Sequence, residues 1–430
     1  MTTSRVVTLE GAPTIVPRGA AASMARPLTM LESMGRKIIL GALGGLRYGH
    51  VTIIDGDVRH ESAASADRAG APACVVRVLD RRFYSAAAFG GTIGIAEAYM
   101  DGAWETDDLA GLVETLTVNQ EAMAGLEIVL NTVRAPVEWA RMWLRRNTVG
   151  GSRRNIRAHY DLSNEFFGLF LDPSMTYSCA IFENGAETLE AAQVEKIDRA
   201  CRKLELKPTD HLLEIGTGWG AMSLHAATKY GCRVMTTTIS DRQHEMAERR
   251  IQEAGLQDRI TLLKEDYRNL TGQYDKLVSI EMVEAVGAGN IDGYFKQCAA
   301  LLKPDGAALV QAIVIRDKFF KSAARSNDFL KEYIFPGSCL LSVQRIVEAV
   351  AKKTDLRVWE MRDFGAHYVR TLSIWRERYM SRLDEVRAMG YDERFVRMWE
   401  YYLAYCEGAF RARHVGDVQV LLTKPGWRGG

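Results

Sequence analysis

The sequence has few cysteines, and none of them is spaced as a metal or redox site requires. Seven cysteines lie singly along 430 residues, and no two form a CxxC pair. An odd and scattered set argues against a disulfide framework and against structural zinc, and it favours a reducing compartment. We therefore expect no metal site.

An excess of charge of one sign is also absent. The 55 lysines and arginines almost balance the 54 aspartates and glutamates, for a net charge of +1. Without a global basic field nucleic acid is not expected as a partner, and an anionic partner must be met by a local patch. Long hydrophobic runs are missing too, since residues 38–46 contain three glycines and span less than half a membrane. These absences predict a cytoplasmic protein that is soluble or bound peripherally to a membrane.

The length of the chain predicts two to three domains, because 430 residues exceed what one hydrophobic core supports. Residues 1–27, with isolated prolines and an Ala-Ala-Ala run, are typical of a disordered tail. Residues 28–133 combine helical patterns with strand-like runs at 49–54 and 74–79, which indicates a compact α+β domain.

A basic segment at residues 134–157 follows, with seven arginines and one glutamate. Trp139, Met142 and Trp143 recur in it at helical spacing. One interpretation is a solvated linker helix. The other is a helix at a membrane surface or between domains, with tryptophans buried at the interface and arginines on phosphates.

Residues 158–430 show the pattern of an α/β domain. Five apolar runs alternate with helical patterns, at residues 211–215, 233–239, 260–263, 276–280 and 307–315. This alternation predicts βαβ units and a mostly parallel, doubly wound sheet of the Rossmann-like class. Runs at 358–361 and 418–422 are expected to supply the last, partly antiparallel strands.

A glycine-rich turn, Glu214-Ile-Gly-Thr-Gly-Trp-Gly220, lies between the first of these runs and a helix expected near Ala221. Gly216 and Gly218 allow a tight turn and close approach of a ligand. The spacing differs from the GxGxxG of dinucleotide sites, and no lysine follows as in a P-loop. The acid before the glycines can hold a positively charged amino-acid moiety, which favours S-adenosylmethionine.

Polar residues end the next two strands. The segment Thr238–Gln243 follows the second strand, where a ribose-binding residue is expected, and Asp266 follows the third, where a carboxylate can accept from an adenine amino group. Because the carboxyl ends of successive parallel strands form one crevice, the three segments predict a single S-adenosylmethionine site. A helix cap or turn role is the alternative for Gln243 and for Asp266.

Four motifs resemble those of the cyclopropane-fatty-acyl-phospholipid synthase family. They are His159-Tyr-Asp-Leu-Ser-Asn164, Leu171-Asp-Pro-Ser-Met-Thr-Tyr-Ser-Cys-Ala180, Lys331-Glu-Tyr-Ile-Phe-Pro-Gly337 and Gly408-Ala-Phe-Arg-Ala-Arg413. The likeness runs from about Arg154 to Leu422. The preceding domain fits the family's lipid-binding N-terminal domain less distinctly.

The resemblance implies a seven-stranded methyltransferase sheet and a C-methyltransferase with S-adenosylmethionine as co-substrate. The implied reaction adds a methylene group to the cis double bond of unsaturated acyl chains in membrane phospholipids, through a carbocation that must be kept from water. In the family a bound bicarbonate removes a proton from the new methyl group, and the cyclopropane ring closes. A homodimer and peripheral attachment to the inner face of the membrane are implied as well.

Two sets of site residues are expected. The resemblance implies a bicarbonate site, called the anion site below, of Cys179, Glu284, Gln311, Ile313 and Tyr368. The cofactor-binding candidates are Tyr177, Ser178, Glu214, Gly216, Gly218, Gly220, Thr238, Gln243, Asp266 and Tyr267.

Gln311 departs from the family pattern, because many members have His there, and Glu284-Ala-Val-Gly287 stands where many have Glu-His-Val-Gly. An amide can donate a hydrogen bond to bicarbonate, but it cannot hold a charge or shuttle a proton. Both forms resemble a second branch of the family that includes the plant enzymes. The departures concern the detailed anion site and the product, and they leave the resemblance to the family intact.

Three other functions stay open from the sequence. The same methyl transfer can end in a methylene- or methyl-branched chain instead of a ring. A conventional O- or N-methyltransferase for a small molecule would leave the long family motifs unexplained. A non-catalytic lipid-binding protein would not need the intact glycine turn together with Cys179, Glu284 and Tyr368.

Overall fold

The computed structural model describes residues 26–62, 70–120 and 162–429. The basic segment 134–157 and all but the last two residues of the tail 1–27 lie outside these ranges, as do His159 and Tyr160 of the first family motif. Within the described ranges, no helix combines the length and the apolar character needed to cross a membrane.

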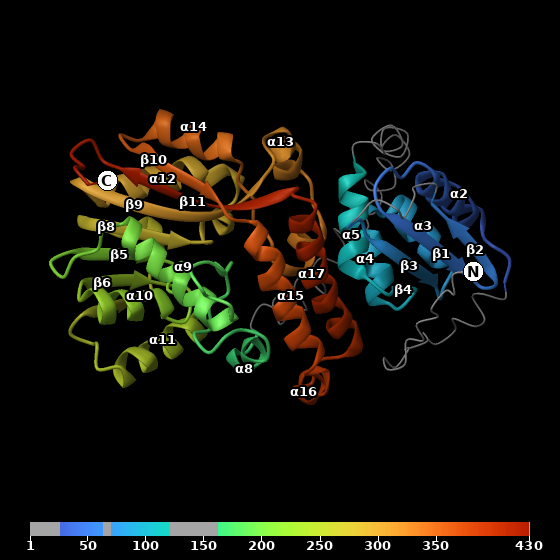
Figure 1. Cartoon of the computed structure of the whole chain (residues 1–430), viewed down its shortest axis with the longest axis horizontal. Helices are drawn as coiled ribbons and strands as arrows, with labels where there is room; N and C mark the ends of the chain where they lie inside the picture. The colour runs from blue at the N-terminus through green and yellow to red at the C-terminus, as the bar shows by residue number, and fades with distance from the viewer. Residues whose placement is uncertain (1–25, 63–69, 121–161, 430) are drawn as a thin grey trace.

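A four-stranded sheet with flanking helices forms the N-terminal unit, residues 26–62 and 70–120 (Figure 1). The strand order is β2-β1-β3-β4, with β1 and β3 parallel and the outer pairs antiparallel. Helix α2 begins at a capping box, in which Thr29 and Glu32 each accept a backbone hydrogen bond from the other. The elements are α2 (Met30–Gly44), β1 (His50–Asp55), β2 (Val58–Glu61), β3 (Ala73–Val78), α3 (Arg82–Phe89), α4 (Gly91–Met100), β4 (Trp104–Thr106) and α5 (Leu109–Val118).

A seven-stranded sheet forms the centre of the C-terminal unit, residues 162–429, which confirms the predicted α/β class. The order is β10-β11-β9-β8-β5-β6-β7, and neighbours are parallel except β11, which is antiparallel to β9 and β10. The strands are β5 (His211–Ile215), β6 (Arg233–Thr237), β7 (Ile260–Leu263), β8 (Tyr274–Ile280), β9 (Leu302–Ile315), β10 (Arg357–Asp363) and β11 (Val415–Thr423). The helices are α8 (Asn164–Gly168), α9 (Leu189–Lys203), α10 (Ala221–His225), α11 (Asp241–Glu253), α12 (Ile291–Ala300), α13 (Asp317–Arg325), α14 (Val343–Lys353), α15 (Ala366–Met380), α16 (Leu383–Ala388) and α17 (Glu393–Arg411).

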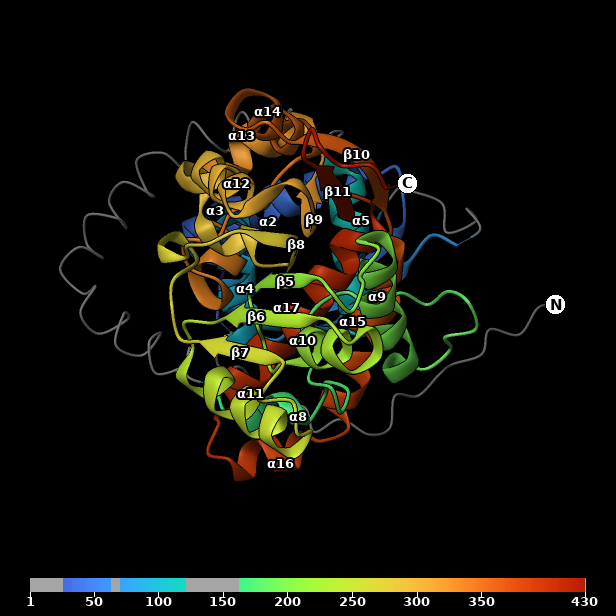
Figure 2. The same cartoon turned by 90° about the vertical axis from the view of Figure 1, so that its left-hand side faces the viewer.

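Helices cover both faces of this sheet, and each face has its own apolar core (Figure 2). Helices α12 and α14 pack on the face that includes Leu213 and Leu277. Helices α9, α10 and α11 pack on the other face, which includes Leu212 and Val234. Leu212 and Leu213 are consecutive in β5 and enter opposite cores, as the two-residue period of a strand requires.

Helix α17 joins the two units through one shared apolar core. It packs against α4 and α5, so closely that a Cβ at Gly408 would lie 2.5 Å from the Ala110 carbonyl oxygen. The Tyr99 hydroxyl donates to the Glu400 carboxylate at 2.9 Å, and Arg397 donates to the Tyr99 carbonyl at 2.5 Å. The N-terminal unit is therefore fixed against α17 by backbone contact and by charged hydrogen bonds.

The order of the strands reverses between β5 and β8. Strands β6 and β7 lie on one side of β5, whereas β8 and β9 lie on the other. Ligands of open α/β sheets bind at such a switch point, outside the carboxyl ends of the strands. The segments that follow β5, β6, β7 and β8 therefore meet at the edge where a ligand is expected.

Candidate active site

The loop Gly216–Gly220 joins β5 to α10 at the switch point. Its three glycines have positive φ, +102° at Gly216, +52° at Gly218 and +90° at Gly220, a conformation that other residues rarely adopt. A Cβ at Gly216 would lie 3.2 Å from the Met282 Cγ, whereas nothing lies within 4 Å of one at Gly218. Gly218 therefore leaves open space beside the backbone, which fits a ligand that approaches the loop closely.

Glu214 lies in β5, two residues before this loop, and its side chain is buried. The carboxylate accepts from the Thr236 hydroxyl at 2.6 Å. Burial raises the pKa of Glu214 to about 8. A cation beside this carboxylate would favour its charged form, as the predicted contact with an amino group requires.

The polar residues after β6 and β7 make contacts within the chain. The Thr238 hydroxyl donates to the Gln243 side-chain oxygen at 2.9 Å, in the first turn of α11. Asp266 binds Arg268 through both carboxylate oxygens and caps the short turn that contains Tyr267. Asp266 thus has the turn role that the sequence left open, and its contact with adenine stays a prediction.

Arg250 of α11 holds the family motif Leu171–Ala180 against the glycine loop. Its guanidinium donates to the carbonyl oxygens of Pro173, Ser174 and Trp219, each at 2.9 Å. Two of these carbonyls belong to the motif and the third belongs to the loop. Arg250 therefore positions the motif beside the predicted cofactor site.

Glu281 directly follows β8, and its carboxylate lies at the centre of the anion site. One oxygen accepts from the Cys179 N–H at 2.9 Å and from the Gln311 side-chain nitrogen at 2.7 Å. The other oxygen accepts from the Tyr368 hydroxyl at 2.8 Å. Three residues that were predicted to bind bicarbonate thus converge on a carboxylate of the protein.

Glu284 lies one turn further along and binds the fourth predicted group. Its Oε1 accepts from the Ile313 N–H at 2.5 Å, and its buried Oε2 has no hydrogen-bond partner among the described residues. Burial, followed by the charge of Glu281, raises the pKa of Glu284 to about 8. Near neutral pH this side chain is therefore mainly a neutral acid.

Asp417 of β11 completes the cluster through Gln311. The Gln311 side-chain nitrogen donates to Asp417 Oδ2 at 3.0 Å, and the Gln311 side-chain oxygen accepts from the Gln419 amide at 3.1 Å. Gln419 thus orients the Gln311 amide with its nitrogen toward both carboxyl groups. Burial, followed by the charge of Glu281, raises the pKa of Asp417 well above its ordinary value.

Lys196 of α9 brings a buried ammonium group beside this cluster. It donates to the Ser178 hydroxyl at 2.6 Å. Burial lowers the pKa of Lys196, and the charge of Glu281 opposes that change. Burial also raises the pKa of the Cys179 thiol well above its usual range. Cys179 therefore contributes its backbone N–H to the site rather than a thiolate.

Aromatic side chains pack around the family motifs. The Tyr177 hydroxyl, predicted near the cofactor, lies 2.6 Å from the Tyr402 hydroxyl. Phe166 and Phe170 are fully buried and meet edge to face at 5.8 Å between ring centroids, whereas Phe335 is 39% exposed. Phe166 and Phe170 are thus core residues, and Phe335 reaches the surface.

Four residues of the site were not identified from the sequence: Arg250, Lys196, Asp417 and Glu281. A signal existed for Glu281, since it directly follows an apolar run, as Asp266 nearly does. The other three lie in α11, α9 and β11, far along the chain from the residues that they contact, and only the tertiary structure shows those contacts.

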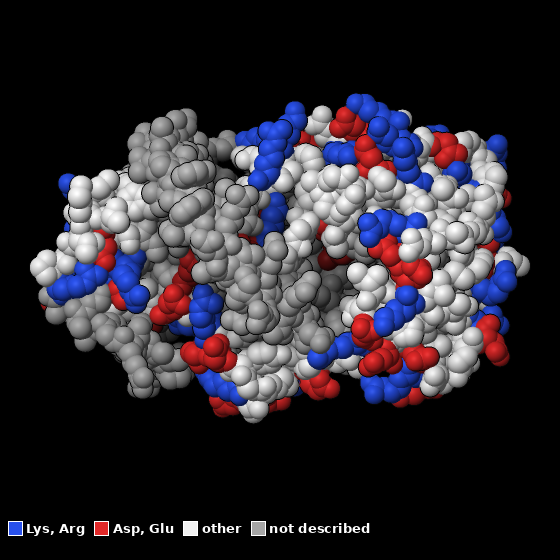
Figure 3. Space-filling model, turned by 180° about the vertical axis from the view of Figure 1, so that it is seen from behind, with Lys and Arg blue, Asp and Glu red and all other residues white. Residues whose placement is uncertain are grey.

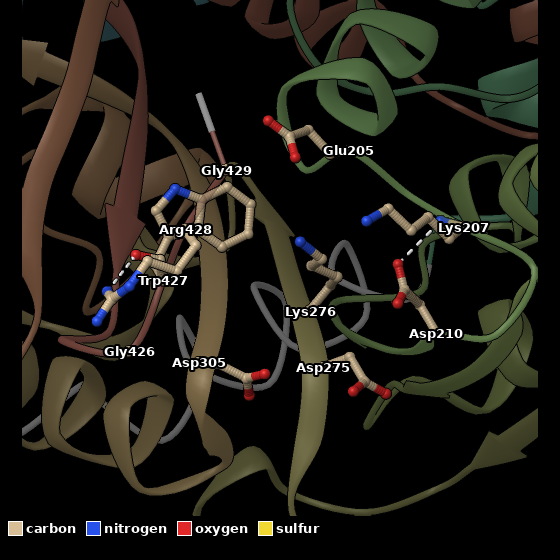
Figure 4. A pocket seen from close by; sticks show the side chains of 10 residues that line it. All are labelled: Glu205, Lys207, Asp210, Asp275, Lys276, Asp305, Gly426, Trp427, Arg428 and Gly429. Atoms are coloured by element: carbon tan, nitrogen blue, oxygen red, sulfur yellow. Dashed lines mark hydrogen bonds between the residues drawn. The ribbon is translucent and has the colours of Figure 1, made fainter.

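A separate hollow of about 300 Å³ lies at the opposite edge of the sheet (Figure 4). Asp210, Asp275 and Lys276 line it at the starts of β5 and β8, and the Lys276 ammonium lies 3.9 Å from the centroid of the Trp427 ring. Ligands of open α/β sheets bind at the carboxyl ends of the strands, not at this amino edge. The hollow is therefore separate from the candidate site.

The raised pKa of Glu284 predicts a pH dependence of stability. The folded protein keeps a proton that the unfolded chain loses near pH 4.5, so the free energy of unfolding falls as pH rises from 4.5 to about 8. The slope from one such group is at most about 1.4 kcal/mol per pH unit. A Glu284→Gln variant should show a flatter slope in urea unfolding across this window. The exposed control Glu253→Gln should keep the wild-type slope, and equal slopes in all three proteins would contradict the burial of Glu284.

Comparison with known proteins places the chain among lipid-modifying methyltransferases. A model of the mycolic acid cyclopropane synthetase family matches residues 149–420. The chain is 38% identical to the cyclopropane-fatty-acyl-phospholipid synthase of Escherichia coli strain K12, over 84% of this chain and 91% of the relative. It is 37% identical to the tuberculostearic acid methyltransferase UfaA1 of Mycobacterium tuberculosis, over 78% of this chain and 80% of the relative. The solved structure of the mycolic acid cyclopropane synthase CmaA1 complexed with SAH and CTAB is similar over 63% of this chain and 98% of its own, with 30% identity and a TM-score of 0.58.

Proposed function

Because the chain belongs to the mycolic acid cyclopropane synthetase family, we propose that it forms cyclopropane rings on unsaturated acyl chains of membrane phospholipids. It is an S-adenosylmethionine-dependent methyltransferase of the cyclopropane synthase type, and it transfers a methylene or methyl group to fatty acyl chains. The phospholipid substrate, the ring as product and the identity of the base belong to the proposal.

One observation carries the proposal: the glycine loop and the anion site are adjacent. Met282 packs against Gly216 of the loop, and the residue before it, Glu281, is the centre of the anion site. A methyl donor on the loop would therefore lie beside a carboxylate that can take a proton. The buried surroundings of Cys179 and Tyr368 would keep water from a carbocation.

The residues after β5 and β6 fit S-adenosylmethionine as co-substrate, which supplies an electrophilic methyl group. The open backbone at Gly218 admits a ligand, and Glu214 would face its amino group. The side chains of Thr238 and Gln243 would bind its ribose hydroxyls, and the Leu171–Ala180 motif would cover it.

Bicarbonate fits the anion site less well. The Cys179 N–H, the Gln311 amide and the Tyr368 hydroxyl already donate to Glu281, and the Ile313 N–H donates to Glu284. No donor of the predicted set is left for a separate anion. No step of the reaction is therefore assigned to bicarbonate.

A branched product is the second candidate. It is favoured by the 37% identity to a protein that is named as a methyltransferase for tuberculostearic acid. In both reactions the acyl double bond attacks the methyl group. The reactions differ in the carbon atom that then loses a proton. The Glu281 carboxylate next to the methyl-donor loop favours loss of the proton from the new methyl group, which closes a ring.

The decisive experiment incubates the purified protein with isotopically labelled S-adenosylmethionine and vesicles of monounsaturated phospholipid. Proton NMR of the recovered lipid should show upfield cyclopropane signals that carry the label. A labelled branched chain without those signals would replace the ring with the second product. Activity on a soluble small acceptor, with none on vesicles, would overturn the proposal.

We also propose peripheral attachment to an anionic membrane surface through the basic segment 134–157, and a homodimer. Lys and Arg side chains are interspersed with Asp and Glu on the described part of the face in Figure 3, so the concentrated charge of this segment is the better candidate for lipid phosphates. Activity on anionic vesicles should fall as salt rises, because such contacts are screened. Activity that does not change with salt would contradict this attachment and would favour the interpretation of residues 134–157 as a linker.

A further inference from the structure

We propose that the carboxylate of Glu281 is the proton acceptor of the reaction and stands in the place of a bound bicarbonate. The inference rests on the proposed function, since it concerns how a methylated acyl chain loses its proton. It also explains why no donor of the anion site is left for a separate anion.

Glu281 accepts three hydrogen bonds, two at one carboxylate oxygen and one at the other. Both of its oxygens face donors: a backbone N–H from Cys179, a side-chain N–H from Gln311 and the hydroxyl of Tyr368. A carboxylate that only accepts hydrogen bonds at both oxygens has the geometry of its charged form. The donors come from a loop, from β9 and from α15, so the carboxylate is held from three sides.

The neighbouring acids leave this role to Glu281. Burial raises the pKa of Glu284 to about 8, so this group holds a proton near neutral pH. Burial also raises the pKa of Asp417 well above its ordinary value, which favours its neutral form. The buried ammonium group of Lys196 is the positive charge on this side of the site, and the charge of Glu281 acts on its pKa. One charged carboxylate beside one ammonium is the arrangement that burial tolerates best.

The position of Gln311 follows from the same arrangement. Because the proposed base, Glu281, is part of the chain, residue 311 does not have to transfer a proton, and an amide can take the place of a histidine. The Gln311 amide instead donates to Glu281 and to Asp417, and Gln419 fixes its orientation. Gln311 is therefore a positioning residue for the carboxylate.

The backbone of Glu281 is strained. Its φ is +48°, a left-handed conformation in which residues other than glycine are uncommon. Such strain persists where the surrounding structure imposes it, and it is frequent at functional sites. This left-handed conformation accompanies the position of Glu281 between the glycine loop and the donors of β9 and α15.

The proposed step transfers one methyl carbon, removes one proton and closes the ring. The π electrons of the acyl double bond form a bond to the methyl carbon of S-adenosylmethionine, and the carbon–sulfur bond breaks with its electron pair going to sulfur. The other alkene carbon becomes a cation. Glu281 takes a proton from the new methyl group, and the electron pair of that C–H bond closes the three-membered ring.

Glu281→Gly is the sharpest test, because glycine relieves the left-handed backbone and removes the carboxylate together. In buffer freed of carbon dioxide, the wild type should keep its full rate on unsaturated phospholipid vesicles. Glu281→Gly should lose at least about 100-fold in that buffer, the usual contribution of a general base. Added bicarbonate should restore much of the loss, because the vacated space and its three donors suit a small anion.

Glu281→Gln is the matched variant. Its amide fills the space but cannot accept a proton, so the variant should be inactive and bicarbonate should not rescue it. Both variants should bind SAH as the wild type does in calorimetry, which shows that the loop is intact. If Glu281→Gly does not fold, the rates of Glu281→Gln and of the wild type in bicarbonate-free buffer decide whether Glu281 is the proton acceptor.

Three results would overturn the inference: a wild type that needs bicarbonate, an active variant in bicarbonate-free buffer, or an SAH-binding Glu281→Gly that bicarbonate does not rescue. Failure of the proposed function has a different signature. In that case the wild type binds SAH but forms no ring on any unsaturated phospholipid, with or without bicarbonate.

Discussion

Replacement of Gly216 by valine is expected to weaken the binding of S-adenosylmethionine at least about 100-fold, which is about 2.7 kcal/mol. The φ of Gly216 is +102°, and a residue with a Cβ in that region costs of order 1–3 kcal/mol. The new Cβ would also lie 3.2 Å from the Met282 Cγ and 3.3 Å from its Cβ. The Met282 side chain, which follows Glu281 in the chain, must therefore move by a few tenths of an ångström. Calorimetry with SAH measures the loss.

Gly231→Val is the matched control for this prediction. Gly231 also has a positive φ, +68°, but it precedes β6 at the amino edge of the sheet, away from the candidate site. A Cβ there would meet Pro208 at an ordinary 3.7 Å. This variant should lose stability through backbone strain and keep the wild-type affinity for SAH. Equal affinities of Gly216→Val and Gly231→Val would show that the glycine loop does not hold the cofactor.

Replacement of Glu407 by alanine is expected to lower the free energy of unfolding by about 3–5 kcal/mol, the cost of breaking a buried ion pair on one side. Glu407 lies in α17 and is fully buried. Its carboxylate accepts from Arg376 of α15 at 2.9 Å and also binds Arg411. Both arginine side chains are themselves largely covered, 26% and 30% exposed, so they would keep their charge without a partner.

Urea unfolding followed by tryptophan fluorescence measures this effect, and Glu385→Ala supplies the control. Glu385 pairs with Arg382 at 3.9 Å, and both side chains are about half exposed. An exposed pair of this kind contributes between zero and about 1 kcal/mol. If Glu407→Ala lost no more stability than Glu385→Ala, the buried network between α15 and α17 would not be a main support of the fold.

The sequence pattern was sufficient for the main strands of the large sheet. Apolar runs at 211–215 and 260–263 coincide with β5 and β7, and the runs at 358–361 and 418–422 lie inside β10 and β11. Strands β5 and β11 are buried along most of their length, so their sequences are continuous apolar runs. Strand β7 has only four residues and β10 is mostly exposed, yet both retain a short apolar run that predicts a strand. Strands β2 and β4 of the N-terminal unit were not predicted, because they have four and three residues and little apolar character.

Sequence and structure contributed different parts of the candidate site. The glycine loop could be predicted because its conformation requires glycine at fixed spacing after a strand, and local chemistry alone decides that requirement. For Asp266 the sequence left two roles open, and the structure shows the turn role, because the carboxylate caps the turn and binds Arg268.

The sequence by itself determined the class of the sheet, the cofactor loop and the family, since each depends on residues that are close together in the chain. Only the tertiary structure decided what stands at the centre of the anion site. Glu281 lies three residues before Glu284 in the same motif, yet its donors come from Cys179, Gln311 and Tyr368, about 30 to 100 residues away. Hydrogen-bond partners at such separations are fixed by how β8, β9 and α15 pack, and no local pattern records that packing.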